Sequence, residues 1–211
     1  MPPNSPFQEH DIVHQSFAVI DREIGPHGFS PAAYSVLRRI IHATADFEYV
    51  SLLKLSDGAI ASAIAALRSG TPLITDVGMV TQGIQRVAAR TFRPQIVTAL
   101  HQVDQALPGR TVTESGLLAC CQDYPHGIYI IGNAPTALLA LCEQIRQGRV
   151  SPALVIGAPV GFINVLEAKQ ALVKSAVPHI RVEGRKGGSG VAAAITNALL
   201  IWAWQQTATE A

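Results

Sequence analysis

The sequence predicts an α/β protein whose parallel sheet is covered by helices on both faces. From about residue 57 onward, short apolar runs alternate with longer segments of helical periodicity, which is the pattern of a parallel sheet. The runs are unbroken and often β-branched, as is typical of strands buried on both faces. The 211 residues are 48% hydrophobic and 15% charged, with no break in composition. We therefore expect a single domain over residues 1–211, in which residues 1–10 form a flexible N-terminal tail.

Two helices come before the alternating part. The first covers residues 11–24 and ends at Gly25-Pro26-His27-Gly28. The second begins with Ser30 as its N-cap and Pro31 at the first helical position, and it runs to about Ala43. Residues 48–55 are apolar but show no clear period, so we assign them to neither class.

The remaining segments alternate regularly. Helices are predicted at residues 57–67, 79–89, 111–121, 134–147, 163–174 and 189–204. Strands are predicted at residues 72–75, 95–100, 127–131, 153–157 and 179–182. The sequence thus predicts a five-stranded parallel sheet.

Ligands of open parallel sheets bind at the carboxyl ends of the strands. Three of the loops predicted there are rich in glycine, at residues 132–136, 157–162 and 184–190. Glycine lets the backbone approach a ligand closely, and the helix N-termini that follow suit anions. Turn chemistry alone is the alternative explanation for each of these glycines.

The loop at residues 184–190 contains Arg185 and Lys186 just before the helix that begins near Ser189. Two cations beside a helix N-terminus favour a carboxylate or phosphate site. A solvated basic turn is the alternative.

Known nucleotide and hydrolase motifs are not matched. The loop at residues 184–190 has its glycines and lysine in the wrong order for a phosphate-binding loop. Residues 188–193 fit G-x-G-x-x-A, but they follow the last predicted strand rather than the first. There is no G-x-S-x-G nucleophile motif. A nucleotide-dependent enzyme, hydride transfer and serine hydrolysis are therefore disfavoured.

His42 differs from the other six histidines because it lies near the end of a predicted helix, where the dipole favours the charged imidazole. Asp46 and Glu48 are expected to raise its pKa further. Such a histidine is suited to general acid catalysis at neutral pH. From the spacing alone, a histidine that merely caps the helix is the competing interpretation.

Charge and cysteine content exclude several classes of function. A net charge of +1 provides no basic field for nucleic acid. Cys120 and Cys121 lie in an apolar helical run and are expected to be buried rather than nucleophilic. No histidine pair has metal-ligand spacing, and no apolar segment is long enough to cross a membrane. Together with the odd number of cysteines, this predicts a cytoplasmic protein without a metal site.

Five segments together resemble the precorrin-8X methylmutase (precorrin isomerase) family in order and spacing, from about Ser16 to Leu200. They are IIHATADFEY with His42, TDVGMV from Thr75, IGNAPTAL from Ile131, GAPVGFINVLEAK from Gly157 and GRKGGSGVAAAITNALL from Gly184.

The resemblance implies a flavodoxin-like three-layer α/β/α fold and an isomerase of cobalamin (corrin) biosynthesis. Such an enzyme moves a methyl group from carbon 11 to carbon 12 of precorrin-8X or cobalt-precorrin-8, giving hydrogenobyrinate or cobyrinate. No cofactor is implied. The enzyme is expected to be a homodimer with its sites near the interface, and the sequence does not tell whether the natural substrate carries cobalt.

The resemblance also places functional residues. His42 matches the catalytic histidine, Ser16 a serine near the substrate, and Arg110 an arginine that contacts a substrate carboxylate. The three glycine-rich loops complete the expected substrate-binding set with Gly132, Asn133, Ala134, Thr136, Pro159, Val160, Gly161, Arg185, Lys186, Gly187, Gly188 and Ser189. The alternative is a corrinoid-binding carrier that retains the product and passes it on without catalysis.

Overall fold

The computed structural model of the chain describes residues 10–210, and side chains through Thr207. Apart from His10, the predicted tail at residues 1–10 lies outside the described residues. His10 is the N-cap of the first helix, where its side chain accepts a hydrogen bond from the Ile12 N–H.

Helices make up most of the described chain. All predicted helices are present to within two residues, except that the last one extends six residues beyond its predicted end, to Glu210. The α-helices are α1 (Asp11–Ile24), α2 (Pro31–Thr44), α3 (Tyr49–Leu52), α4 (Ala59–Arg68), α5 (Gly78–Arg90), α6 (Val112–Asp123), α7 (Pro135–Arg146), α8 (Val165–Val173) and α9 (Ser189–Glu210). A single 3₁₀ turn, η1 (Ala99–His101), takes the end of the segment predicted as the strand at residues 95–100.

The sheet has six strands in the order β1-β6-β5-β4-β2-β3. The strands are β1 (Leu53–Leu55), β2 (Leu73–Thr75), β3 (Ile96–Thr98), β4 (Ile128–Ile131), β5 (Leu154–Gly157) and β6 (His179–Val182). The five predicted strands, β2 to β6, are present and pair in parallel.

The prediction of five parallel strands was wrong in one respect, because β1 adds an antiparallel edge strand. Leu53 faces Val182, and Leu55 faces Ile180. The strand has only three residues and follows α3 directly, so the sequence shows too little alternation to reveal it. The sheet is therefore mixed, and it differs by this strand from the all-parallel sheet that the sequence predicts.

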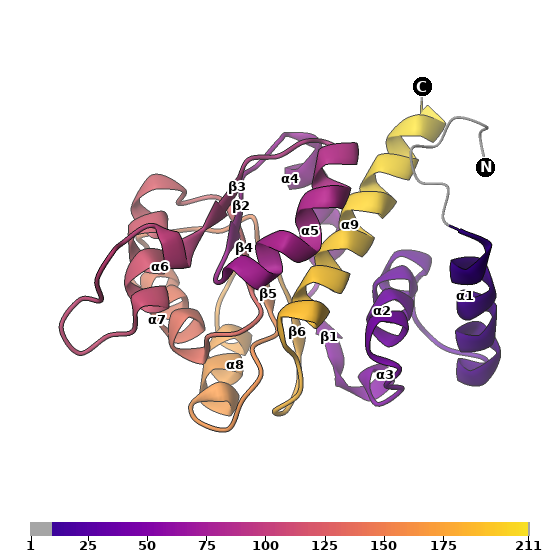
Figure 1. Cartoon of the computed structure of the whole chain (residues 1–211), viewed down its shortest axis with the longest axis horizontal. Coiled ribbons are helices and arrows are strands. Elements are labelled where there is room, and N and C mark those ends of the chain that lie inside the picture. Colours follow the sequence, from indigo (N-terminus) through magenta and orange to yellow (C-terminus); the bar gives the residue numbers. More distant parts are fainter. Residues whose placement is uncertain (1–9, 211) are drawn as a thin grey trace.

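Alternate residues of the strands point into two separate cores. Leu73, Ile128 and Ile156 pack with residues of α2, α4, α5 and α9. Ile74 and Tyr129 pack with residues of α6, α7 and α8 on the opposite face. Figure 1 shows the resulting arrangement of helices on both sides of the sheet, with α1 outside α2 at one end.

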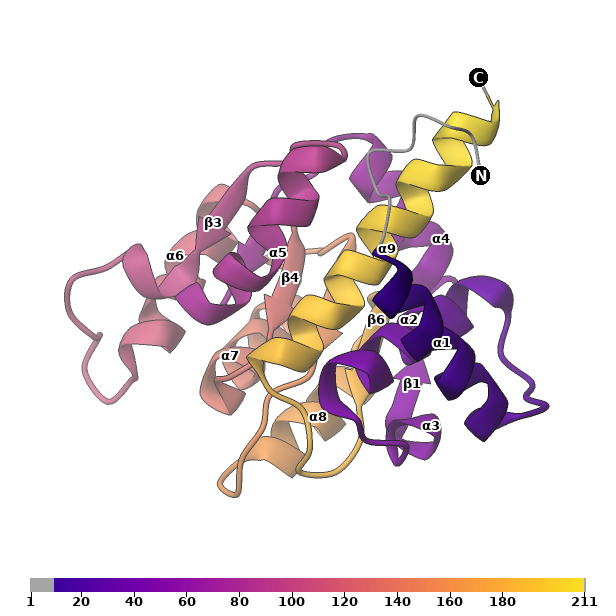
Figure 2. The same cartoon turned by 45° about the vertical axis from the view of Figure 1, so that its right-hand side comes forward.

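Helix α9 packs against α2 and α5 on one face of the sheet. In Figure 2 it runs between α5 on one side and α1 and α2 on the other. The approach of α5 is close, because a Cβ atom on Gly83 would lie 2.7 Å from the Cβ of Ala193. Asn197 of α9 also donates a side-chain hydrogen bond to the Gly83 carbonyl at 2.9 Å. Helix α2, which ends near His42, packs with α9 in the same core through Val36, Leu37 and Ile40.

Candidate functional site

Strand β2 has β3 on one side and β4 on the other. The strands are therefore added in one direction from β2 to β3 and in the opposite direction from β4 onward. In open α/β sheets such a switch point leaves a crevice at the carboxyl ends of the two strands. Here Asp76 follows β2, and residues 132–134 follow β4. The site is therefore best described from this point outward.

The carboxylate of Asp76 lies in this crevice, between the ends of β2 and β4. It is fully buried. Its Oδ1 accepts a hydrogen bond from the Gly132 N–H at 3.1 Å, and its Oδ2 accepts from the N–H groups of Asn133 and Ala134 at 2.6 and 2.8 Å. Burial raises the pKa of Asp76, and these backbone donors oppose that rise. The anion position before α7 is thus occupied from within.

The two other glycine-rich loops are bonded to each other. The Ala158 carbonyl accepts from the Gly188 N–H at 2.8 Å, and the Arg185 carbonyl accepts from the Gly161 N–H at 3.3 Å. Gly187 has a φ of +149°, and a Cβ there would lie 2.3 Å from the Ala158 oxygen. Only glycine fits at this position, so the predicted close backbone approach is real but joins two loops of the protein.

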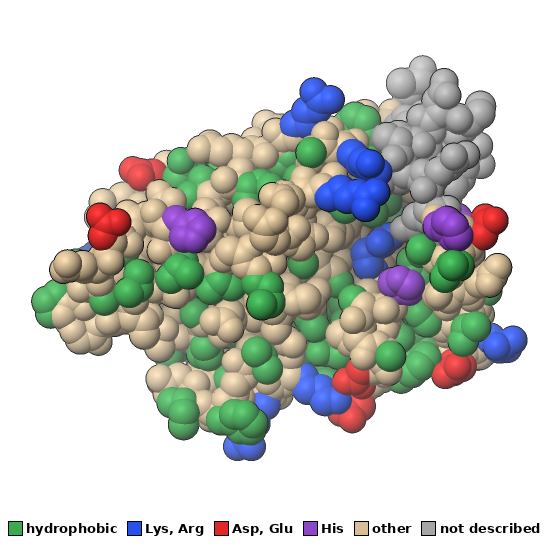
Figure 3. All heavy atoms as spheres, viewed as in Figure 1, with side chains coloured by type: hydrophobic (Ala, Val, Ile, Leu, Met, Phe, Trp, Pro, Cys, Tyr) green, Lys and Arg blue, Asp and Glu red, His purple; other side chains and the backbone are tan. Residues whose placement is uncertain are grey.

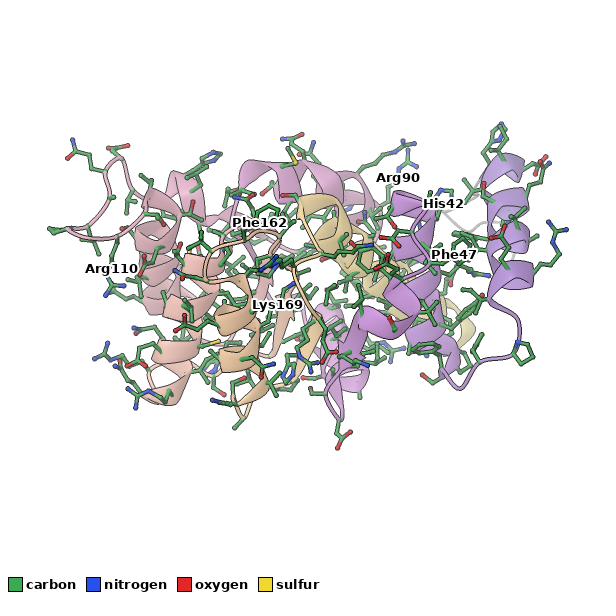
Figure 4. The ribbon with its side chains drawn as sticks, turned by 90° about the horizontal axis from the view of Figure 1, so that it is seen from below. His42, Phe47, Arg90, Arg110, Phe162 and Lys169 are labelled. Atoms are coloured by element: carbon green, nitrogen blue, oxygen red, sulfur yellow. The ribbon has the colours of Figure 1, made fainter. Side chains whose placement is uncertain are left out.

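Lys169 of α8 donates hydrogen bonds to the second of these two loops. The side chain is 4% exposed, and its Nζ donates to the carbonyls of Gly184 and Lys186 at 2.8 and 2.7 Å. Burial lowers the pKa of this ammonium to about 8. Figure 4 places Lys169 near the middle of the molecule, beneath the loop that carries Phe162.

Lys186 links the last loop to the segment after α2. Its Nζ donates to Asp46 Oδ2 at 2.6 Å and lies 3.0 Å from Glu48 Oε2. The hydrogen bond from Lys186 lowers the pKa of Asp46. The sequence predicts that these two carboxylates act on His42, whereas in the structure both contact Lys186. Two carboxylates thus balance the charge of this lysine.

Arg185 is the more open cation of the loop. It is exposed, and its guanidinium carbon lies 5.7 Å from the centre of the Phe162 ring. Among the side chains that the structure describes, it has no acidic partner. Phe162 is itself 81% exposed, and Val160 is 45% exposed. This loop pair therefore presents one guanidinium and two apolar side chains to solvent.

His42 lies in the last turn of α2, and its imidazole is exposed. It makes no hydrogen bond to a described residue, and its ring meets the edge of the Phe17 ring at 5.3 Å between centroids. Helix α2 ends directly beyond it, where Ala45 adopts the left-handed conformation and donates to the Ile41 carbonyl at 2.7 Å. The imidazole is thus open to a ligand at the negative end of the helix dipole.

Ser16 precedes Phe17 on α1 and is half-buried. Its hydroxyl donates to the Ile12 carbonyl at 2.8 Å within the helix. Both lone pairs of the hydroxyl oxygen remain as acceptors.

Arg110 lies far from His42 within one chain. Figure 4 shows the two residues at opposite ends of the molecule. Arg110 is exposed and forms an ion pair with Glu114 at the start of α6. Beside it, the Thr111 and Thr136 hydroxyls are 3.2 Å apart. The structure therefore brings Arg110 close to the loop after β4, and it leaves His42 in a separate group.

The other chemistry-bearing groups are accounted for by burial. Cys120, Cys121 and Cys142 are free and buried, and burial raises the pKa of each thiol, to about 12, 11 and 12. Within residues 10–210, no group of three His, Cys, Asp or Glu side chains is arranged to hold a metal ion. The helices described here include none with the length and apolar character needed to span a bilayer.

The sequence prediction names none of Asp76, Lys169 and Phe17 as a site residue, although Asp76 and Lys169 lie in the segments that resemble the family. A polar residue at the carboxyl end of a buried strand signals a role at the switch point, and Asp76 meets that criterion. The lysine in an otherwise apolar helical face was the available sign for Lys169. Phe17 carried no sign beyond its place in α1.

Comparison with known proteins identifies the family to which the chain belongs. The family model described as precorrin-8X methylmutase matches residues 11–202. A cobalt-precorrin-8 methylmutase from Synechocystis sp. is 50% identical, over 94% of this chain and 98% of that protein. A precorrin-8X methylmutase from Pseudomonas aeruginosa is 36% identical, over 89% and 93%.

Among solved structures, the precorrin-8X methyl mutase from Thermus thermophilus superimposes with a TM-score of 0.84 at 43% identity. The match covers 93% of this chain and 99% of that one. The match of both sequence and fold over nearly the full length leads to one conclusion: the chain is an isomerase that belongs to the precorrin-8X methylmutase family.

Proposed function

We propose that this chain converts precorrin-8X or cobalt-precorrin-8 into hydrogenobyrinate or cobyrinate by moving a methyl group from carbon 11 to carbon 12. The family match over residues 11–202 carries this proposal. The reaction is a rearrangement within one conjugated macrocycle. It needs neither a nucleophile nor an electron donor, which agrees with thiols that are all buried.

His42 supplies the proton in this proposal. Protonation makes the conjugated system of the substrate more electron-poor and so assists the shift of the methyl group. General acid catalysis of this kind contributes about 10²- to 10⁴-fold. The exposure of the imidazole and its place at the end of α2 support the assignment.

Residues at the carboxyl edge of the sheet, together with Ser16 on α1 and Arg110 before α6, hold the periphery of the substrate in this proposal. Ser16, Arg110 and Arg185 offer polar or cationic groups, and Lys186 keeps one of its three N–H donors beyond those used by Asp46 and Glu48. The glycine-rich loops contribute the remaining residues of the proposed set, namely Gly132, Asn133, Ala134, Thr136, Pro159, Val160, Gly161, Gly187, Gly188 and Ser189.

The backbone of the first of these loops contributes less than expected, because Asp76 already accepts its N–H groups. The exposed Asn133 side chain and the Thr136 hydroxyl are the groups of this loop that remain for a substrate.

A homodimer would place Arg110 of one chain near His42 of the other. The two residues lie at opposite ends of one chain (Figure 4), so a second copy is needed to bring an Arg110 side chain to the His42 group. The exposed side chains of Met79, Phe162 and Ile163, at 72, 81 and 77%, provide an apolar surface for such an interface. The cytoplasmic location and the single-domain organisation stay predictions of the sequence.

Absorbance spectroscopy tests the reaction, because the methyl shift changes the conjugation of the macrocycle. The wild-type chain is mixed with metal-free precorrin-8X and, separately, with cobalt-precorrin-8. Conversion of either form supports the isomerase and identifies the substrate. Tight binding of both forms without any spectral conversion would contradict it and favour the carrier.

A further inference from the structure

A cavity of about 330 Å³ opens between α1, α2 and α9, beside the His42 group. Its lining includes His14, Phe17 and Asp21 from α1, Arg38 and Arg39 from α2, and Trp202 from α9. Phe17 belongs to both places, since its ring also meets His42. Arg38 and His42 are four residues apart on α2, or about 6 Å along the helix axis. The cavity therefore adjoins the proposed catalytic residue.

Positive charge exceeds negative charge among these lining groups. Arg38 Nη1 lies 3.1 Å from Asp21 Oδ2, and the Tyr34 hydroxyl donates to Asp21 Oδ1 at 2.6 Å. One carboxylate therefore serves two donors, so the positive charge of Arg38 is only partly balanced. Figure 3 shows blue Lys or Arg side chains along the line of α9, and purple His side chains over α1 and α2. This composition favours an anion.

Two lining residues carry buried donors that lack an acceptor. Arg38 Nε and Trp202 Nε1 are shielded from solvent and have no hydrogen-bond partner. Buried polar groups in proteins are almost always paired, so each exception needs an explanation. Both donors belong to residues in the wall of the cavity, so a ligand that shifts either side chain can supply the missing acceptor oxygen. The Arg38 guanidinium is also held over the Phe17 ring, 4.3 Å from its centre, which fixes its orientation.

The volume of the cavity limits which part of the substrate can enter it. A cavity of about 330 Å³ is at the lower limit of small-molecule sites and is too small for a tetrapyrrole macrocycle. It accommodates a short flexible acid side chain. The planar guanidinium fork matches a carboxylate in two-point geometry.

We propose that this cavity binds one acetate or propionate carboxylate of the tetrapyrrole, with Arg38 as its charged contact. The edge of the macrocycle then lies at the exposed imidazole of His42. This assignment rests on the proposed function, and it adds a binding residue that acts on affinity rather than on the chemical step.

The test is a titration of wild-type and variant chains with the reaction product, followed by absorbance. Arg38→Met is expected to raise the product Kd and the substrate KM about 10- to 100-fold, as for loss of a charged hydrogen bond. The kcat is expected to change by less than about threefold, because the contact exists before and during the reaction. Arg38→Lys, which keeps the charge and loses the fork, is expected to fall in between.

Asp21→Asn separates ligand binding from a purely structural ion pair. It frees the Arg38 guanidinium while leaving its charge, so product binding is expected to tighten or stay unchanged. A structural role predicts instead that Asp21→Asn and Arg38→Met weaken binding alike. Arg146→Met is the matched control, since Arg146 forms a similar ion pair with Glu143 on α7 and is expected to leave binding unchanged.

Unchanged product Kd and KM in Arg38→Met would overturn the proposal, and so would equal weakening by Asp21→Asn. Thermal unfolding of each variant checks that the fold is retained, and Arg38→Lys and Asp21→Asn carry the test if Arg38→Met does not fold. Because product binding is measured without turnover, the result is independent of the activity test. A wild-type chain that binds the product but does not convert substrate would contradict the proposed function alone.

Discussion

At the carboxyl edge of the sheet, Asp76 and Lys169 are buried, and backbone groups of the same chain satisfy their polar atoms. At the end of α2, the His42 imidazole is exposed and makes no hydrogen bond to a described residue. We call Asp76 and Lys169, together with the half-buried Gly187 that joins the two loops, the buried edge. The difference separates stability from chemistry: substitutions in the buried edge should unfold the protein, and substitution of His42 should stop only its reaction.

Asp76→Ala is expected to have the largest effect on stability. It removes the acceptor for three backbone N–H groups before α7. Unsatisfied buried groups cost about 1–3 kcal/mol each, and we expect a loss of about 3–5 kcal/mol in the free energy of unfolding in urea. The exposed Asp57→Ala is the control. A loss in Asp76→Ala below about 1 kcal/mol would show that the crevice does not depend on this carboxylate.

Gly187→Ala is expected to cost about 2–4 kcal/mol, because its Cβ would overlap the Ala158 carbonyl oxygen at 2.3 Å. Gly190→Ala provides a matched comparison three residues away. Nothing lies within 4 Å of its Cβ position, so its stability should change by less than about 1 kcal/mol. Thermal unfolding of both variants measures the difference, and equal stabilities would mean that the two loops are not packed as described.

The buried edge should also respond to pH through Lys169. Burial lowers its pKa in the folded chain to about 8, from 10.5. Between these values the unfolded chain binds more protons, so the free energy of unfolding should rise with pH in this window. The gain relative to Lys169→Met should approach roughly 3 kcal/mol. Urea unfolding of both chains from pH 7 to 10.5 measures it, and parallel pH profiles would refute the account.

The sequence predicted the scaffold well because its signals are local. The five parallel strands are apolar runs between helices, and Ser30 and Pro31 mark the start of α2 as expected, with Ser30 Oγ accepting from the Ala33 N–H. The antiparallel strand β1 was not predicted, because three residues beside a short helix are too few to show the alternation of apolar and polar residues that marks a strand.

The sequence predicted where the glycine-rich loops lie but not which groups they contact. The loops at residues 132–136 and 184–190 do lie at the carboxyl edge. Which anion meets the first loop depends on Asp76, more than 50 residues earlier in the chain. Likewise, the balance of Lys186 by Asp46 is a contact across 140 residues. Such pairings arise from tertiary packing, which spacing along one sequence does not encode.

His42→Asn separates the acid role of His42 from a structural role, because asparagine keeps polarity and removes the transferable proton. The account predicts that kcat falls about 10²- to 10⁴-fold, while product Kd and the free energy of unfolding stay near the wild-type values because the side chain is exposed. Wild-type turnover in His42→Asn would contradict the acid role. A loss of turnover that only accompanies unfolding would contradict the separation between the buried edge and His42.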